Sequence, residues 1–183
     1  MNILISGGAK NGKSYYAQRL AKQMAGGGGS GGSSRPLYYI ATMIPHDEED
    51  RARIKRHLAE RSGWGFETLE QGLDLTAILQ QPGVDPKGAF LLDSVTALLS
   101  NEMFREDGSV DHEAARRVAE DCTAFAEATG NTVFVSDYIY GDADAYESLT
   151  EEYRQALALI DRQLAAVCDR LIEVSAGLIE EWK

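Results

Sequence analysis

The chain has few cysteines, no long apolar run and a deficit of positive charge. Its 183 residues include two cysteines, Cys122 and Cys168, and each falls in step with apolar residues of a predicted helix. This spacing favours buried, reduced thiols over a disulfide or a zinc site. No stretch reaches the ~18 apolar residues of a membrane span, and the first residues lack the basic start of a signal peptide. We therefore expect a cytoplasmic protein without a membrane span.

Positive charge is scarce as well. The chain has 18 Lys and Arg against 29 Asp and Glu, so its net charge is -11 at neutral pH. A protein this acidic repels nucleic acids and anionic membranes, which excludes both as diffuse electrostatic partners. An anionic small molecule would need a local binding device that overcomes the overall field.

The rest of the composition is that of an ordinary globular protein, with 44% apolar and 26% charged residues. The length predicts one domain over residues 1–183. Apolar runs of strand length alternate with stretches of helical period, which predicts an α/β fold with a mostly parallel sheet flanked by helices. The predicted strands cover residues 2–6, 37–42, 66–70, 89–93, 132–136 and 171–174. The predicted helices cover residues 13–24, 48–61, 73–80, 95–104, 111–128 and 149–168.

One segment breaks this alternation. Residues 25–34 hold six of the 18 glycines together with serines, a composition that behaves as flexible coil. A natural low-complexity loop and an engineered linker both fit this sequence. In either case we expect a flexible Gly/Ser loop within the domain, on its surface and without a catalytic role.

A phosphate-binding motif follows the first predicted strand and opens the first predicted helix. It matches G-x-x-x-x-G-K-S/T, and its residues are Gly7, Gly8, Ala9, Lys10, Asn11, Gly12, Lys13 and Ser14. Glycines let successive backbone N–H groups point inward as an anion nest, and the helix N-terminus adds positive potential. Lys13 is expected to reach the β- and γ-phosphates of ATP or GTP, and Ser14 to bind Mg²⁺. This is the local device that an acidic protein requires.

A second Mg²⁺ ligand is predicted at Asp93, which ends the apolar strand at 89–93. The carboxyl ends of parallel strands meet at one edge, so Asp93 should lie beside the phosphate-binding loop. Alternatively, Asp93 caps the helix that follows. No guanine-reading N-K-x-D motif is present, which argues against a small GTPase. A P-loop NTPase-like protein of this size is typical of a small-molecule kinase or a related transferase.

Six spaced motifs occur in order along the first part of the chain. They lie at residues 3–14, 39–42, 47–49, 53–61, 64–70 and 93–101. Together they resemble the bifunctional cobinamide kinase / cobinamide-phosphate guanylyltransferase family of cobalamin biosynthesis. The likeness covers residues 1 to about 104 and weakens afterwards, where Asp137 and Tyr138 replace an Asn-Glu turn and Asp161 and Arg162 replace an Asn-Gln pair.

The resemblance implies a two-step enzyme. The first step phosphorylates the hydroxyl of adenosylcobinamide with ATP or GTP, and the second transfers GMP from GTP through a guanylylated histidine. In this sequence Lys13 would serve the first step and His57 would carry the nucleotide, with Arg53, Arg61 and Glu70 among the nucleotide-binding residues. The resemblance further implies a homo-oligomer, a trimer, whose histidine-bearing helix lies over the nucleotide site.

The residues around His57 support two interpretations. Arg53, His57 and Arg61 are spaced i, i+4, i+8, so we expect them on one helical face as a cationic stripe that clamps a triphosphate. Flanking cations would also keep the imidazole neutral, as a nucleophile must be. Alternatively, this face is solvated and its arginines pair with Glu49 or Glu60. His46 is a second candidate for the nucleotide-carrying histidine, and His112 is expected on the surface.

Two other functions stay open at this point. The departures from the family pattern after residue 136 are compatible with a diverged P-loop kinase. Such an enzyme would phosphorylate another alcohol and would not carry out the guanylyl transfer. A nucleotide-binding regulatory protein with little or no turnover would keep the same phosphate-binding loop. Lys13, Ser14 and Asp93 together favour catalysis over the regulatory alternative.

Overall fold

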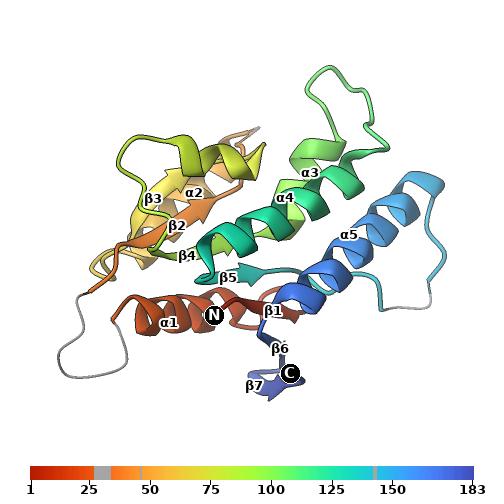
Figure 1. The fold of residues 1–183 in the computed structure, drawn as a ribbon. Coiled ribbons are helices and arrows are strands. Elements are labelled where there is room, and N and C mark those ends of the chain that lie inside the picture. The colour runs from red at the N-terminus through yellow and green to blue at the C-terminus, as the bar shows by residue number, and fades with distance from the viewer. Residues whose placement is uncertain (27–33, 46, 142–143) are drawn as a thin grey trace.

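The structure is a computed structural model that describes residues 1–26, 34–45, 47–141 and 144–183. Over these residues the chain forms one seven-stranded sheet in the order β3-β2-β4-β5-β1-β6-β7 (Figure 1). The strands are β1 (Ile3–Gly7), β2 (Leu37–Ala41), β3 (Glu67–Glu70), β4 (Ala89–Asp93), β5 (Thr132–Val135), β6 (Arg170–Ser175) and β7 (Leu178–Glu181). The helices are α1 (Lys13–Ala25), α2 (Glu48–Glu60), η1 (Leu75–Gln80), α3 (Val95–Met103), α4 (Ala114–Thr129) and α5 (Ser148–Val167).

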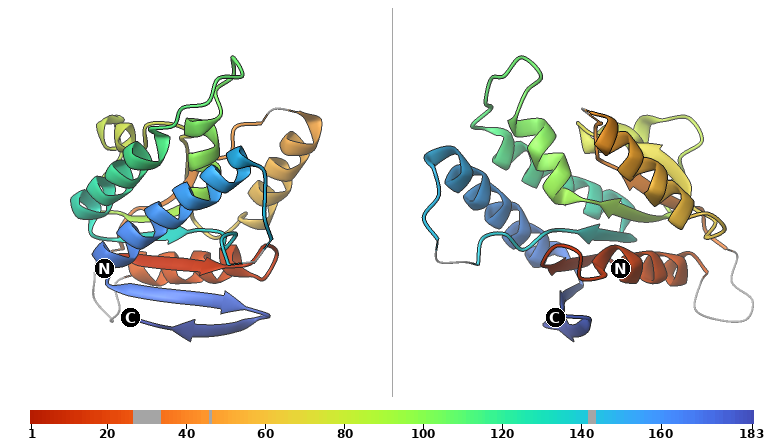
Figure 2. Two further views of the ribbon diagram at one scale, coloured as in Figure 1. Left: turned by 90° about the vertical axis from the view of Figure 1, so that its right-hand side faces the viewer. Right: turned by 180° about the vertical axis from the view of Figure 1, so that it is seen from behind.

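Helices cover both faces of the sheet (Figure 2). Leu4 of β1 faces a core built with α3, α4 and α5, whereas its neighbours Ile3 and Ile5 face a second core built with α1. Because both faces are buried, the strands carry continuous apolar runs in place of alternation. The predicted α/β fold with a mostly parallel, helix-flanked sheet is therefore confirmed. Cys122 and Cys168 are buried free thiols, as their spacing predicted.

The C-terminal hairpin was not predicted. The sequence indicates a last strand at 171–174, but the chain turns after β6 and returns as antiparallel β7, with Ser175 opposite Leu178. The two turn residues, Ala176 and Gly177, have φ values of 49° and 80°, the positive values of a type I′ turn. The sequence concealed this hairpin, because Ala-Gly replaces the usual Asn-Gly and all residues of β7 are exposed.

The parallel strands bring their carboxyl ends to one edge of the sheet. Val135 of β5 lies opposite Ile5 of β1 on one side and Asp93 of β4 on the other. Ala41 of β2 continues this row beside Asp93. The residues that follow these strands are therefore neighbours in space, although they come from four separate parts of the chain. No described helix is long and apolar enough to cross a membrane.

Candidate functional site

The phosphate-binding loop joins β1 to α1 with the geometry that its glycines permit. Gly7 has φ 152°, and a Cβ there would overlap the carbonyl of Val174 on β6. Gly12 precedes the helix in the left-handed region, with φ 92°. Asn11 anchors the loop, since its Nδ2 donates to the Val174 carbonyl and its Oδ1 accepts from the Lys13 amide. Four of the predicted loop residues are exposed: Gly8, Ala9, Lys10 and Gly12.

Lys13 is buried at the start of α1, with only 5% of its surface exposed. Its Nζ donates to the carbonyl oxygen of Gly8 at 2.7 Å and to Oδ1 of Asp137 at 2.8 Å. Because its amine bonds to a carbonyl oxygen of the phosphate-binding loop, Lys13 lies at the position where this loop would bind the phosphates of a nucleotide. The sequence marked Asp137, which follows β5, as a departure from the family's Asn-Glu turn but not as a site residue; its position just beyond a buried strand was a further signal.

Asp93 ends β4 next to this loop, and its Oδ2 accepts from the Tyr39 hydroxyl at 2.9 Å. The alternative in which Asp93 caps the following helix is wrong. Ser94 caps α3, since its side chain accepts from the Ala97 amide. The Asp93 carboxylate is thus directed to the edge of the sheet, where Ser14 of α1 lines the same pocket.

That pocket has a volume of about 660 Å³, a size typical of small-molecule sites. Its lining residues come from α2 and from the carboxyl ends of β2, β3 and β4. Ser14 and Asp93 line it on the side of the phosphate-binding loop, and Glu70 lines it from the exposed end of β3. Helix α2 contributes three basic residues to the lining, Arg51, Lys55 and His57, and Arg61 lines the pocket from just past the helix end.

Arg61 is the most deeply placed cation of the pocket, with 7% of its surface exposed. Its guanidinium carbon lies 3.5 Å from the centroid of the Tyr39 ring, a cation–π contact. Its Nε is buried and has no hydrogen-bond partner among the residues that the structure describes. A buried donor without a partner is costly, so this arrangement is suited to an anionic ligand.

The structure brings His57 and Arg61 into the pocket but leaves Arg53 outside its lining. Arg53 instead lies 4.0 Å from Glu49 and 3.9 Å from Asp50, which is the pairing foreseen for a solvated face. Four residues turn an α-helix through about 400°, so each residue of an i, i+4 series lies about 40° further around the axis than the one before it. Over two such steps Arg53 is carried away from the face that holds Arg61. Arg51 and Lys55 take the place that the predicted stripe gave to Arg53.

The remaining expectations concern His46, His112 and Glu60, the last as an ion-pair partner of the arginines on α2. His112 is exposed on the surface, as expected, and its Nδ1 lies 2.5 Å from Glu152 Oε1. This hydrogen bond raises the pKa of His112. His46 and the side chain of Glu60 lie outside the described residues, as does most of the Gly/Ser loop at 25–34.

Asn101 joins two loops of the pocket wall. Its Nδ2 donates to the Thr42 carbonyl at 2.7 Å and to the Gly72 carbonyl at 2.9 Å. Thr42 in turn receives a hydrogen bond from the Ser94 amide at 2.8 Å and donates to the Ser94 carbonyl at 2.9 Å. The segments that follow β2, β3 and β4 are thereby held together around the pocket.

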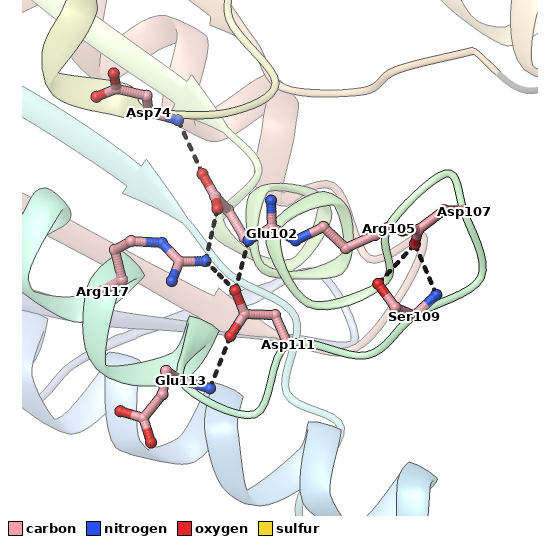
Figure 3. Close-up of polar contacts among 8 residues, drawn as sticks. All are labelled: Asp74, Glu102, Arg105, Asp107, Ser109, Asp111, Glu113 and Arg117. Carbon is pink, nitrogen blue, oxygen red and sulfur yellow. Dashed lines mark hydrogen bonds and ion pairs between the residues drawn. The ribbon is translucent and has the colours of Figure 1, made fainter.

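A polar network behind this wall connects η1 to α3 and α4 (Figure 3). Buried Glu102 accepts from the Asp74 amide at 2.9 Å and from Arg117 at 3.0 Å. Asp111 accepts from Arg105, from Arg117 and from the Glu113 amide, and these bonds lower the pKa of Asp111 to about 2. The network fixes the turn that follows the pocket-lining end of β3.

A buried carboxyl group lies between α5 and the segment that follows β5. Asp161 of α5 accepts from the hydroxyls of Ser136 at 2.9 Å and Tyr140 at 2.8 Å. Burial raises the pKa of Asp161 to about 6, despite these two bonds. It also raises the pKa of Tyr140, so that hydroxyl stays protonated and donates.

The sequence model of one family, described as cobinamide kinase / cobinamide phosphate guanyltransferase, matches residues 3–181. The bifunctional adenosylcobalamin biosynthesis protein CobP of Pseudomonas aeruginosa is 30% identical over 97% of this chain and 95% of its own length. The bifunctional adenosylcobalamin biosynthesis protein CobU of Salmonella typhimurium is 28% identical over 97% of both chains.

The fold has solved neighbours as well. A KaiC-like protein of Pyrococcus horikoshii OT3 superposes with a TM-score of 0.52 at 14% identity, over 98% of this chain and 74% of that one. This likeness concerns the fold alone and agrees with a P-loop NTPase-like architecture. The family match extends well beyond residue 104, where the predicted resemblance weakened. The chain therefore belongs to the cobinamide kinase / cobinamide phosphate guanyltransferase family, which confirms the resemblance and the enzyme class that it implied.

Proposed function

We propose that this chain performs both steps of its family, phosphorylation of adenosylcobinamide followed by GMP transfer from GTP, within one domain over residues 1–183. One observation carries the proposal: a single pocket is lined by Ser14 and Asp93 beside the phosphate-binding loop, by His57 of α2 and by Arg61 just past the end of α2. A product phosphorylated at one end of this pocket therefore needs no second site for the guanylyl transfer.

In the first step, the backbone of the loop and Lys13 would hold the β- and γ-phosphates of ATP or GTP. The residues fit Mg²⁺: the described residues contain no cluster of three or more His, Cys, Asp or Glu that could hold a metal alone, but a hydroxyl and one carboxylate line the pocket together. Ser14 and Asp93 would hold the ion with phosphate oxygens as further ligands. When bound, Mg²⁺ neutralises charge that develops on the phosphates.

In the second step, a ring nitrogen of His57 would attack the α-phosphorus of GTP. An N–P bond forms, the bond to the β-phosphate oxygen breaks, and pyrophosphate leaves. The phosphate of cobinamide phosphate then displaces the histidine, which restores the neutral imidazole. Arg61, Arg51 and Lys55 supply the positive charge that the anionic nucleotide requires.

Three further features are proposed on the resemblance. The protein would act in the cytoplasm, which the two buried free thiols support. It would form a homo-oligomer, a trimer. Its nucleotide would be ATP or GTP in the first step and GTP in the second.

Two variants separate the steps. Lys13→Ala should abolish nucleotide-dependent phosphorylation of cobinamide, because the phosphates lose their buried cation. His57→Ala should leave that step intact and block GMP transfer to supplied cobinamide phosphate. His112→Ala is the matched control, since this histidine is exposed away from the pocket. GMP transfer that survives in His57→Ala would contradict the assignment of the histidine.

A further inference from the structure

The ion pair between Lys13 and Asp137 places a carboxylate next to the phosphate-binding amine. Asp137 Oδ1 lies 2.8 Å from Lys13 Nζ, and the side chain of Asp137 is 32% exposed whereas that of Lys13 is 6% exposed. The carboxylate therefore faces the solvent side of the site, and the amine lies beneath it. A carboxylate here repels the phosphates that the loop binds, so binding alone does not explain its presence.

The backbone holds this carboxylate in place. The Asp137 amide donates to the Thr96 hydroxyl of α3 at 3.0 Å. The amides on either side are also bonded to β1, Ser136 to the Ile5 carbonyl and Tyr138 to the Gly7 carbonyl, each at 2.9 Å. Asp137 is thus fixed to the strand that carries the phosphate-binding loop, as a group with a positional role requires.

Asp137 also lies between the two parts of the kinase site. β5 is the strand between β4 and β1, and Val135 is level with both Asp93 and Ile5. Asp137 follows two residues later, at the carboxyl edge of the sheet. Its backbone bonds to Thr96, three residues after the proposed Mg²⁺ ligand Asp93, and the next residue bonds to Gly7, where the phosphate-binding loop begins. The acceptor hydroxyl must approach the γ-phosphate at this edge.

We propose that Asp137 is a catalytic residue of the phosphorylation step, where it accepts the proton of the acceptor hydroxyl. This inference rests on the proposed function. Nucleotide binding draws Lys13 toward the phosphates, and the carboxylate then faces the alcohol. The alcohol oxygen bonds to the γ-phosphorus, the bond from that phosphorus to the β-phosphate oxygen breaks, the nucleoside diphosphate leaves, and the proton passes to Asp137 and on to water.

The test compares Asp137→Asn and Asp137→Glu with wild type and with Asp144→Asn, an exposed carboxylate of the same segment. Three quantities are measured: kcat for cobinamide phosphorylation, the Kd of a non-hydrolysable triphosphate, and the rate of GMP transfer to supplied cobinamide phosphate. Asp137→Asn should lower kcat by about 10²–10⁴-fold, the usual contribution of a general base. Triphosphate binding should be as tight as in wild type or tighter, and GMP transfer should be unchanged. Asp137→Glu, which keeps a carboxylate, should retain more activity than Asp137→Asn.

Two results would overturn the inference. One is a kcat for Asp137→Asn close to that of wild type. The other is a loss of kcat matched by weaker triphosphate binding and slower GMP transfer, which would assign Asp137 only to holding Lys13 or the fold. Wild-type protein that does not phosphorylate cobinamide would instead contradict the proposed function itself.

Discussion

Replacement of the buried carboxyl Asp161 by Asn is expected to stabilise the protein at neutral pH. Burial raises the pKa of Asp161 from 3.8 to about 6. The folded state thus holds this proton more tightly than the unfolded state. The stability that this contributes is fully present below pH 3.8 and is lost as the pH rises through 6. A difference of about 2 pKa units at 1.36 kcal/mol each gives an upper limit of about 3 kcal/mol for ionisation at pH 7.5.

Asn removes this ionisation and keeps an oxygen for the hydroxyls of Ser136 and Tyr140. Its amide group takes the place of Oδ1, which is buried without a hydrogen-bond partner among the described residues, so part of the gain is lost. We expect a net gain of about 1–3 kcal/mol at pH 7.5 that shrinks toward zero near pH 4.

The assay is urea denaturation of Asp161→Asn and wild type between pH 4 and 8, with exposed Asp144→Asn as the control. The quantity of interest is the difference in unfolding free energy between variant and wild type at each pH. The titration of all other groups contributes equally to both proteins and cancels in this difference. A difference that does not change with pH, or that favours wild type at pH 7.5, would refute the reasoning.

Three further predictions concern the pocket and the hairpin. Arg61→Met should raise the Kd of a non-hydrolysable GTP analogue in calorimetry by about 10–100-fold, the value of one or two charge-assisted hydrogen bonds; a Kd within twofold of wild type would contradict its role. Asn101→Ala should lower the unfolding free energy by about 1–3 kcal/mol in urea, since the Thr42 and Gly72 carbonyls lose their donor; an unchanged midpoint would contradict this. Ala176→Asn should raise the unfolding free energy by up to about 1 kcal/mol, because Asn tolerates positive φ in a type I′ turn; an unchanged or lower midpoint would count against the turn geometry.

The parts of the site that could be predicted are those encoded locally. The phosphate-binding loop is one continuous motif, and Asp93 ends a buried strand, so strand and loop patterns were enough to place both. The pocket-facing side of α2 was predicted less well. Residues at i, i+4 spacing rotate gradually around the helix axis, and the prediction ignored this rotation when it included Arg53.

Contacts between distant segments could not be predicted from one sequence. Lys13 and Asp137 are 124 residues apart, and their pairing depends on β5 lying beside β1. The same holds for the buried group formed by Ser136, Tyr140 and Asp161. Sequence patterns indicate which strands are buried, but not the order in which those strands meet.

The most direct test of the central claim is mass spectrometry of the product from wild-type protein, cobinamide and Mg²⁺ with ATP or GTP. If one pocket performs both steps, ATP alone should add a phosphate to cobinamide, and GTP should carry the product on to the GMP adduct. Cobinamide that gains no phosphate with either nucleotide would contradict the account, and a phosphate without GMP in the presence of GTP would contradict the second step.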